Sequence, residues 1–242
     1  LNRGYAVISI DQRGFGESSG SIRVMDPKFE GRDLVAILDW AEQNLDWLAW
    51  RDENTGQMVV PPENKTSVVD AENLVVGAIG SSYGGGYQLL LLAVDEKNRL
   101  DALVPDITWH DLRYSLNPGD TVKTGWDLAL VGLGEASSNS SGAANFEEPG
   151  TGTTDNRGLD PFIRETLARG AATNEFPREA LDWFNYHSLG FWCANQDLPA
   201  MPYPHPRWDV DPNTMVFGMF ADEAVPTAGS VDRQLPAVDV LL

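Results

Sequence analysis

Residues 76–93 read VGAIGSSYGGGYQLLLLA, an apolar run that meets a cluster of serines and glycines and then becomes rich in leucine. Residues 74–79 have the short apolar pattern of a buried strand, and residues 88–94 have the all-round apolar pattern of a buried helix. Between them, GSSYG at residues 80–84 matches the sequence G-x-S-x-G. This pentapeptide arises often by chance in a chain with 23 glycines, but a strand before it and a helix after it form the context of a nucleophile elbow.

The residues around Ser82 fit the chemistry of acyl transfer. In a tight strand-to-helix crossing, a side chain at Gly80 or Gly84 would collide with the chain, and the serine between them is strained so that its hydroxyl is exposed. The N-terminus of the following helix favours a developing negative charge, and the Tyr83 N–H can donate a hydrogen bond to that oxyanion. We therefore predict Ser82 as a catalytic nucleophile, whereas Ser81 is interpreted as a packing residue.

The rest of the chain predicts an α/β architecture. Residues 5–10 and 102–109 have the pattern of apolar strands, and residues 28–45 have the three- and four-residue spacing of one helix face. Two more helices are predicted at residues 161–170 and 177–186. Apolar strands that alternate with helices indicate a mostly parallel sheet with helices on both faces.

Composition divides the chain into three parts. Residues 134–158 are rich in Gly, Ser, Thr and Asn, which predicts a long loop. We expect residues 1–133 to form a partial α/β core, residues 134–213 to form this loop and an inserted helical cap, and residues 214–242 to return to the sheet. Because the strand pattern is entered almost at once and the chain stops within another strand pattern, we expect the fold to be truncated at both ends.

The charge balance restricts the partners. Seventeen Lys and Arg residues against 36 Asp and Glu residues give a formal net charge of −19, which repels phosphate backbones and anionic membrane surfaces. We expect no nucleic-acid partner. No run approaches the ~18 consecutive apolar residues of a membrane span. The acidity is typical of a well-solvated surface, and adaptation to high salt is the alternative; the single cysteine, Cys193, leaves the cellular location open.

Three weaker motifs are set aside. Residues 14–19 (GFGESS) lack the third glycine of a dinucleotide-binding turn, and the glycine cluster at 80–86 lacks the Lys and Ser or Thr of a phosphate loop. Residues 209–213 (DVDPN) resemble the start of a calcium loop, but Thr214 and Phe220 occupy the positions of the required Gly and Glu. We therefore expect no nucleotide cofactor and no metal.

Four blocks together resemble one family: GYAVISIDQRGFGESSG, EGRDLVAILDWAEQN, VGAIGSSYGGGYQLLLLA and ITWHDLRYSLNPGDTVKTGW. They look like the X-Pro dipeptidyl-peptidase and cocaine-esterase family of α/β-hydrolases, over about the first 130 residues. The resemblance implies the α/β-hydrolase fold with an inserted helical cap. It also implies an acyl-serine mechanism on a small-molecule ester or amide or on a peptide. A second oxyanion donor is implied as well, a tyrosine hydroxyl from a loop upstream of Leu1.

The catalytic acid has two candidate positions. In this fold the acid follows the nucleophile in the sequence, and a histidine follows the acid. Asp222 comes after the predicted strand at residues 214–220 and resembles an acid turn. Alternatively, residues 236–242 are the acid-bearing strand and the acid lies beyond Leu242, which is the interpretation we favour. Both interpretations require a histidine beyond Leu242.

Other polar residues are expected to be structural. His110 is interpreted as a hydrogen-bonded residue, and His187 and His205 as packing residues in the cap region. Asp11 and Arg13 are expected to fix a loop near the serine by hydrogen bonds and an ion pair. The aromatic residues between 183 and 192 suit either a substrate pocket or a core.

Two classes of function remain open. The first is a serine hydrolase, an acyl esterase or an X-Pro-type peptidase, which the available residues do not separate. Since residues 1–242 hold no histidine in the expected order, we expect them to be inactive on their own. The alternative is a non-catalytic binding module of the α/β-hydrolase fold.

Overall fold

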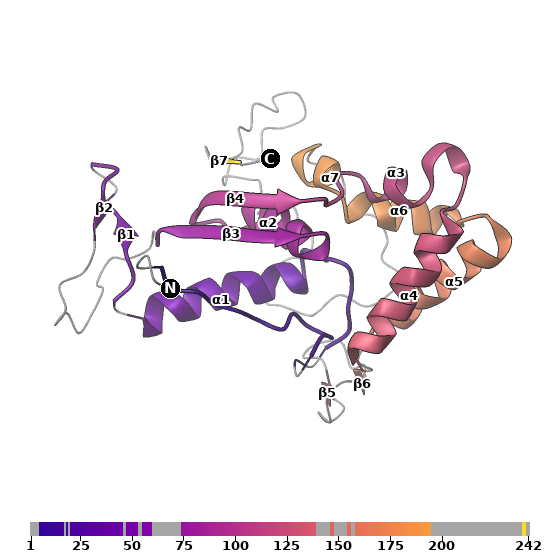
Figure 1. The fold of residues 1–242 in the computed structure, drawn as a ribbon, viewed down its shortest axis with the longest axis horizontal. Coiled ribbons are helices and arrows are strands. Elements are labelled where there is room, and N and C mark those ends of the chain that lie inside the picture. Colours follow the sequence, from indigo (N-terminus) through magenta and orange to yellow (C-terminus); the bar gives the residue numbers. More distant parts are fainter. Residues whose placement is uncertain are drawn as a thin grey trace.

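The computed structural model (Figure 1) describes residues 5–16, 18, 20–45, 47–52, 55–59, 74–138, 146–147, 154–155, 158–194 and 239–240. A strand of a parallel sheet precedes the turn that contains Ser82. Strand β3 (Val76–Ser81) pairs in parallel with β4 (Leu100–Asp106), which pairs in parallel with β7 (Asp239–Val240). The sheet order is therefore β3-β4-β7. The strands predicted at residues 74–79 and 102–109 are confirmed with slightly shifted ends.

Two helices accompany this sheet. Helix α2 (Tyr83–Val94) packs on both β3 and β4, and α1 (Glu30–Asn44) packs on α2 (Figure 1). Along β3, Val76 and Ala78 are half-buried whereas Gly77 and Ile79 are exposed, which is the alternation of a sheet with one covered face. Helices on both faces were predicted. In the part of the chain that the structure describes, α2 covers one face, and the Ile79 side chain on the other is 77% exposed.

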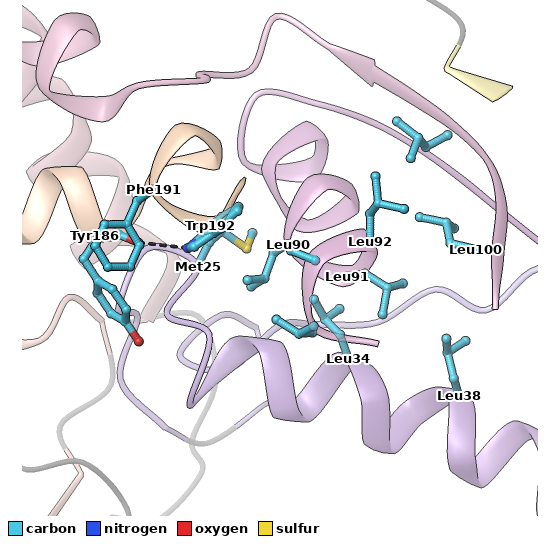
Figure 2. Packing of buried hydrophobic residues seen from close by; sticks show 13 residues of the cluster. Met25, Leu34, Leu38, Leu90, Leu91, Leu92, Leu100, Tyr186, Phe191 and Trp192 are labelled. Atoms are coloured by element: carbon cyan, nitrogen blue, oxygen red, sulfur yellow. Dashed lines mark hydrogen bonds between the residues drawn. The ribbon is translucent and has the colours of Figure 1, made fainter. Parts of the chain in front are cut away.

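One hydrophobic core lies between α1, α2 and the sheet. On α1, Leu34, Leu38 and Ala41 are buried at spacings that place them on one helix face. Figure 2 shows Leu34 and Leu38 lying across from Leu90 and Leu91 of α2. The helix predicted at residues 28–45 is therefore confirmed, with its apolar face toward α2.

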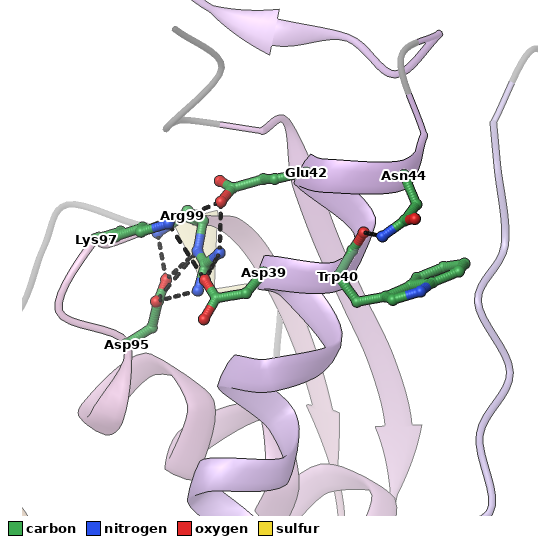
Figure 3. A network of polar contacts seen from close by, with 7 residues as sticks. All are labelled: Asp39, Trp40, Glu42, Asn44, Asp95, Lys97 and Arg99. Atoms are coloured by element: carbon green, nitrogen blue, oxygen red, sulfur yellow. Dashed lines mark hydrogen bonds and ion pairs between the residues drawn. The ribbon is translucent and has the colours of Figure 1, made fainter. Parts of the chain in front are cut away.

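An ionic network joins α1 to the turn between α2 and β4. The fully buried guanidinium of Arg99 lies 2.7 Å from Asp95, 2.9 Å from Asp39 and 3.0 Å from Glu42. Lys97 Nζ lies 2.8 Å from the same Glu42 carboxylate and 3.2 Å from Asp39. Figure 3 shows these side chains converging beside the end of α1. The network fixes α1 against the start of β4.

A helical region follows β4. Its elements are α3 (Leu112–Leu116), the 3₁₀ helix η1 (Pro118–Asp120), α4 (Thr124–Ser138), α5 (Pro161–Thr173), α6 (Arg178–Tyr186) and α7 (Leu189–Ala194). Helix α4 packs on α5, and α3 packs on α6. The helices predicted at residues 161–170 and 177–186 are confirmed as α5 and α6.

Helix α4 corrects the sequence-based boundary of the long loop. Residues 134–138 were predicted as the start of that loop, but they form the last turn of α4. A Cβ atom at Gly134 would lie 2.7 Å from Leu159 Cγ, so this glycine permits close packing rather than marking a loop. Farther along, β5 (Phe146–Glu147) and β6 (Thr154–Asp155) pair in an antiparallel manner.

The strand predicted at residues 5–10 is wrong. This segment has no strand assignment, and four of its side chains are exposed: Tyr5, Val7, Ile8 and Ile10. A strand needs a hydrogen-bonding neighbour, and β3 pairs in the described residues with β4 alone. Nearby, β1 (Trp50–Arg51) and β2 (Met58–Val59) form a short antiparallel pair. The strand predicted at residues 214–220 lies outside the described residues.

Candidate active site

Ser82 occupies the turn between β3 and α2. Its φ of 54° and ψ of −115° are strained for a residue with a side chain, and the residue is exposed. The Ser82 N–H donates a hydrogen bond of 2.8 Å to the Asp106 carbonyl. Its own carbonyl accepts hydrogen bonds from the Gly85 N–H at 2.9 Å and the Gly86 N–H at 3.0 Å, which begin α2. The strand, turn and helix expected around this serine are thus all present.

The glycines near Ser82 differ in how much room they have. A Cβ atom at Gly80 would lie 2.5 Å from the Gly84 carbonyl oxygen, so only glycine fits at position 80. At Gly84, a Cβ atom would meet nothing within 4 Å, so the collision expected there is absent. The close approach is made by the next residues of α2, because a Cβ atom at Gly85 would lie 2.8 Å from Thr108 Cβ.

The backbone N–H of Tyr83 lies at the start of α2, whereas its side chain packs in the interior. Its N–H is the first of α2 and donates no hydrogen bond within the described residues, as is usual for the first turn of a helix. The ring is packed edge-on against Phe15, with 5.2 Å between the ring centroids, and is tilted against Trp109, with 6.3 Å between the centroids. Burial, with the nearby carboxyl of Glu30, raises the pKa of the phenol well above its usual value. The N–H is therefore available to an oxyanion, while the phenol belongs to the interior.

Asp106 holds the serine turn from the adjacent strand, and the sequence reasoning missed it. Besides its carbonyl contact with Ser82, its Oδ2 accepts a hydrogen bond of 2.8 Å from the Ser81 hydroxyl. Ser81 is exposed, so its interpretation as a packing residue is wrong. The available signal was topological, because parallel strands such as β3 and β4 end at the same edge of a sheet. The next residue, Ile107, also has a positive φ, 42°, so both strand ends are strained.

A buried polar network lies beneath the site. The Glu30 carboxylate accepts hydrogen bonds from the N–H groups of Arg23 (2.7 Å) and Asp26 (3.0 Å), and burial raises its pKa to about 7. His187 is fully buried, with Nδ1–H donating to the Val24 carbonyl at 2.8 Å and Nε2 lying 3.6 Å from the Asp26 carboxylate. His187 is thus held in the interior by the hydrogen bond of its Nδ1, in agreement with its predicted structural role.

The other predicted residues take separate positions. His110 is exposed, and its carbonyl accepts a hydrogen bond of 3.4 Å from the Gly190 N–H. Within the described residues, no histidine ring is hydrogen-bonded to Ser82. Asp222 and His205 lie outside the part of the chain that the structure describes.

The loop that contains Arg13 is fixed as expected. Arg13 makes a bidentate ion pair with Asp33 of α1, at 2.7 Å from Nε and 2.9 Å from Nη2. The carbonyl of Asp11 accepts a hydrogen bond of 2.6 Å from the Ser18 hydroxyl. Both residues hold the loop in place.

Hydrogen bonds join the segment that follows β4 to the two residues that follow α6. Trp109 Nε1–H donates to the His187 carbonyl at 2.8 Å, and the Leu112 N–H donates to Ser188 Oγ at 2.8 Å. The aromatic residues that suited either a pocket or a core are almost fully buried: Trp183, Phe184, Tyr186, Phe191 and Trp192. They pack as core.

The described residues contain no group of three or more His, Cys, Asp and Glu side chains that could hold a metal ion. Among the same residues, none of the helices combines the length and apolar character needed to cross a membrane.

Parallel strands packed by a helix, with a strained and exposed serine where strand meets helix, are features that this chain shares with the α/β-hydrolase class. The sequence profile of the X-Pro dipeptidyl-peptidase (S15) family matches residues 1–184, and the chain belongs to this family of serine peptidases.

Two curated relatives from Escherichia coli are similar over a shorter segment. Both bear the name "Uncharacterized 31.7 kDa protein in traX-finO intergenic region", and both are 28% identical over 122 residues. The aligned segment covers 50% of this chain but 31% of each relative, so the chain spans about a third of their length.

Proposed function

We propose that the protein is a serine hydrolase that cleaves an ester or amide through an acyl intermediate on Ser82. The observation that carries the proposal is the conformation of this residue. It is exposed, has a φ of 54°, and lies between a parallel strand and a buried helix. Membership of a serine peptidase family supports the same chemistry.

The residues around Ser82 have definite roles in such a reaction. The serine Oγ attacks the carbonyl carbon of the substrate while a general base accepts the hydroxyl proton, which then passes to the leaving group. The oxyanion that forms accepts a hydrogen bond from the Tyr83 N–H, and the N-terminus of α2 favours its charge. Water then hydrolyses the acyl-serine. Gly80 permits the tight turn that this arrangement needs.

We propose that the acid and the histidine of the triad follow Leu242 in the sequence. The support is the parallel pairing of β7 with β4, at Ala102 with Asp239 and Leu103 with Val240. Because parallel strands end at the same edge of a sheet, β7 ends at the edge where Ser82 lies, and an acid that follows β7 would be on that edge. This favours an acid beyond Leu242 over Asp222.

The family favours a peptide substrate, and cleavage after an X-Pro unit is the specific reaction we propose to test first. An acyl esterase is the second candidate within the same mechanism. A binding module without catalysis is the candidate from another class, and it is favoured by one observation: no histidine of the described residues is hydrogen-bonded to Ser82.

The deciding experiment replaces Ser82 with Ala in the full natural polypeptide that contains these residues. Turnover of an X-Pro-p-nitroanilide and of a p-nitrophenyl ester is measured, together with labelling by a fluorophosphonate. We expect Ser82→Ala to abolish labelling and to lower kcat roughly 10⁴-fold or more. The matched control is Ser81→Ala, which removes a neighbouring hydroxyl and should stay within about tenfold of wild type, since that hydroxyl is hydrogen-bonded to Asp106 on the adjacent strand. Equal activity of wild type and Ser82→Ala would remove the hydrolase assignment.

A further inference from the structure

Gln88 is the polar exception in a buried helix. It follows Ser82 by six positions on α2, whose sequence is YGGGYQLLLLAV, and it is fully buried. Burying an amide among leucines is costly unless its donors and acceptor are hydrogen-bonded. The partners of this amide therefore show what the residue is for.

Each polar atom of the Gln88 side chain has a backbone partner. Nε2 donates to the carbonyl of Gly84 at 2.9 Å, and to the carbonyls of Gly80 and Val104 at 3.2 Å each. Oε1 accepts a hydrogen bond of 2.8 Å from the Val104 N–H. Because an N–H group can only donate, the Val104 contact fixes which end of the amide is oxygen. Two amide hydrogens serve three carbonyls, so one hydrogen is shared.

These partners are the backbone that surrounds the serine. Gly80 precedes Ser82 on β3, and Gly84 follows it on α2. Val104 belongs to the neighbouring strand, where the residue opposite Gly80 is Pro105, which has no N–H to donate. The Gln88 amide thus joins the strand before the serine, the helix after it and the adjacent strand at one point.

We propose that Gln88 is a positioning residue that holds the backbone of residues 80–84 in the strained form required for nucleophilic attack by Ser82. A positive φ at a residue with a side chain persists only where the surroundings impose it. The Asp106 carbonyl restrains the Ser82 N–H from one strand end, and Gln88 restrains the glycines on both sides. This inference rests on the proposed hydrolase function of Ser82.

The experiment must distinguish a loss of the Ser82 backbone geometry from a loss of folding stability. Gln88→Met keeps the length of the side chain and removes all four contacts, whereas Leu92→Ala lowers stability on the same helix without a polar contact to the serine turn. In the full natural polypeptide, we expect Gln88→Met to lower kcat about 10²-fold with KM within about threefold of wild type. Leu92→Ala should leave both constants near wild type at temperatures where it is folded.

Gln88→Glu adds a readout that a structural role alone would not give. When ionised, the carboxylate cannot donate to the Gly80 and Gly84 carbonyls; when protonated, it regains one donor, against the two of the amide, beside its acceptor oxygen. The ratio of kcat for Gln88→Glu to kcat for wild type should therefore rise as the pH is lowered, while both proteins remain folded by circular dichroism. A ratio that stays constant with pH, together with an unchanged kcat in Gln88→Met, would overturn the proposal.

Amide hydrogen exchange keeps this test independent of activity. In Gln88→Met, the amides of Ser82, Gly85 and Gly86 should exchange faster than in Leu92→Ala at matched stability. If Ser82→Ala leaves turnover intact, the hydrolase proposal fails, whereas faster exchange in Gln88→Met still supports control of the turn by Gln88. Equal exchange in the two variants contradicts that control whatever the activity of Ser82.

Discussion

Helices α2 and α4 are both rich in apolar residues, but they differ in which side chains they bury and in how the buried polar groups are hydrogen-bonded. α2 buries Leu90, Leu91 and Leu92, and the amide of its buried Gln88 has every polar atom hydrogen-bonded. α4 exposes Trp126, Leu128 and Leu133 and buries Asp127. Within the described residues, neither oxygen of the Asp127 carboxyl has a hydrogen-bond partner.

The difference shows that surroundings, rather than composition, decide which face of an apolar helix is buried. α2 lies between the sheet and α1, so nearly all of its faces are covered, whereas α4 packs on α5. A buried polar group with all its bonds made adds rigidity, and one without bonds reduces stability. We therefore expect substitutions in and around α2 to cost more than matched substitutions in α4.

The largest effect is expected at the C-terminal end of α2. Replacing Arg99 with Met would leave the Asp95 carboxylate, which is 3% exposed, without its main partner, and we expect a loss of about 3–5 kcal/mol in the free energy of unfolding. Glu135→Gln on α4 is the control, because the ion pair of Glu135 with Arg164 is 3.5 Å long and partly exposed. That change should cost at most about 0.5 kcal/mol. Urea unfolding of both variants measures the difference, and equal losses would contradict the comparison.

An intermediate effect is expected from adding one methyl group to each helix. A Cβ atom at Gly85 of α2 would meet Thr108 Cβ at 2.8 Å and the Asp106 carbonyl at 3.1 Å, so Gly85→Ala should cost about 1–3 kcal/mol. At Gly132 of α4 it would meet nothing within 4 Å, and Gly132→Ala should add up to about 1 kcal/mol through helix propensity. Thermal melts that shift in the same direction would break the contrast between the helices.

The sequence predicted those features whose causes are local. The strand, turn and helix around Ser82 follow from an apolar run, a glycine cluster and a leucine block that are adjacent in the chain. Residues 5–10 have the same strand-like composition, yet they form no strand because pairing depends on a neighbour that the pattern does not specify. Residues 134–138 looked like a loop because the glycine that lets α4 approach Leu159 resembles a turn residue.

The side-chain contacts that position the site could not be predicted from the sequence. Gln88 was interpreted as part of an apolar helix, since nothing in its neighbours predicts that its amide reaches Gly80 and Val104 on two strands. Asp106 lies within the strand predicted at residues 102–109, but its contact with Ser81 depends on the register of β3 against β4. His187 was correctly taken as structural, although its bond to the Val24 carbonyl joins residues that are 163 positions apart.

The smallest expected effect, and the one that best tests the contrast, concerns the buried carboxyl of α4. Burial raises the pKa of Asp127 from 3.8 to about 7. Between these values the folded protein keeps the proton and the unfolded chain has lost it, so this group makes stability fall as the pH rises from 3.8 to about 7. Asp127→Asn should therefore gain stability relative to wild type as the pH rises toward ~8, and this gain should shrink toward pH ~4.

The pH dependence of Asp127→Asn can be separated from that of other groups. Glu30 also has a pKa raised to about 7, so it contributes a slope of the same sign, but it is present in both proteins and cancels in their difference. Glu165→Gln on α5 is the matched control, because it makes the same acid-to-amide change at an exposed position. Urea unfolding across this pH range gives the three curves. The difference in the free energy of unfolding between Asp127→Asn and wild type could instead be the same at pH ~4 and ~8. In that case partners in the folded protein stabilise the Asp127 carboxylate, and the contrast between α4 and α2 fails.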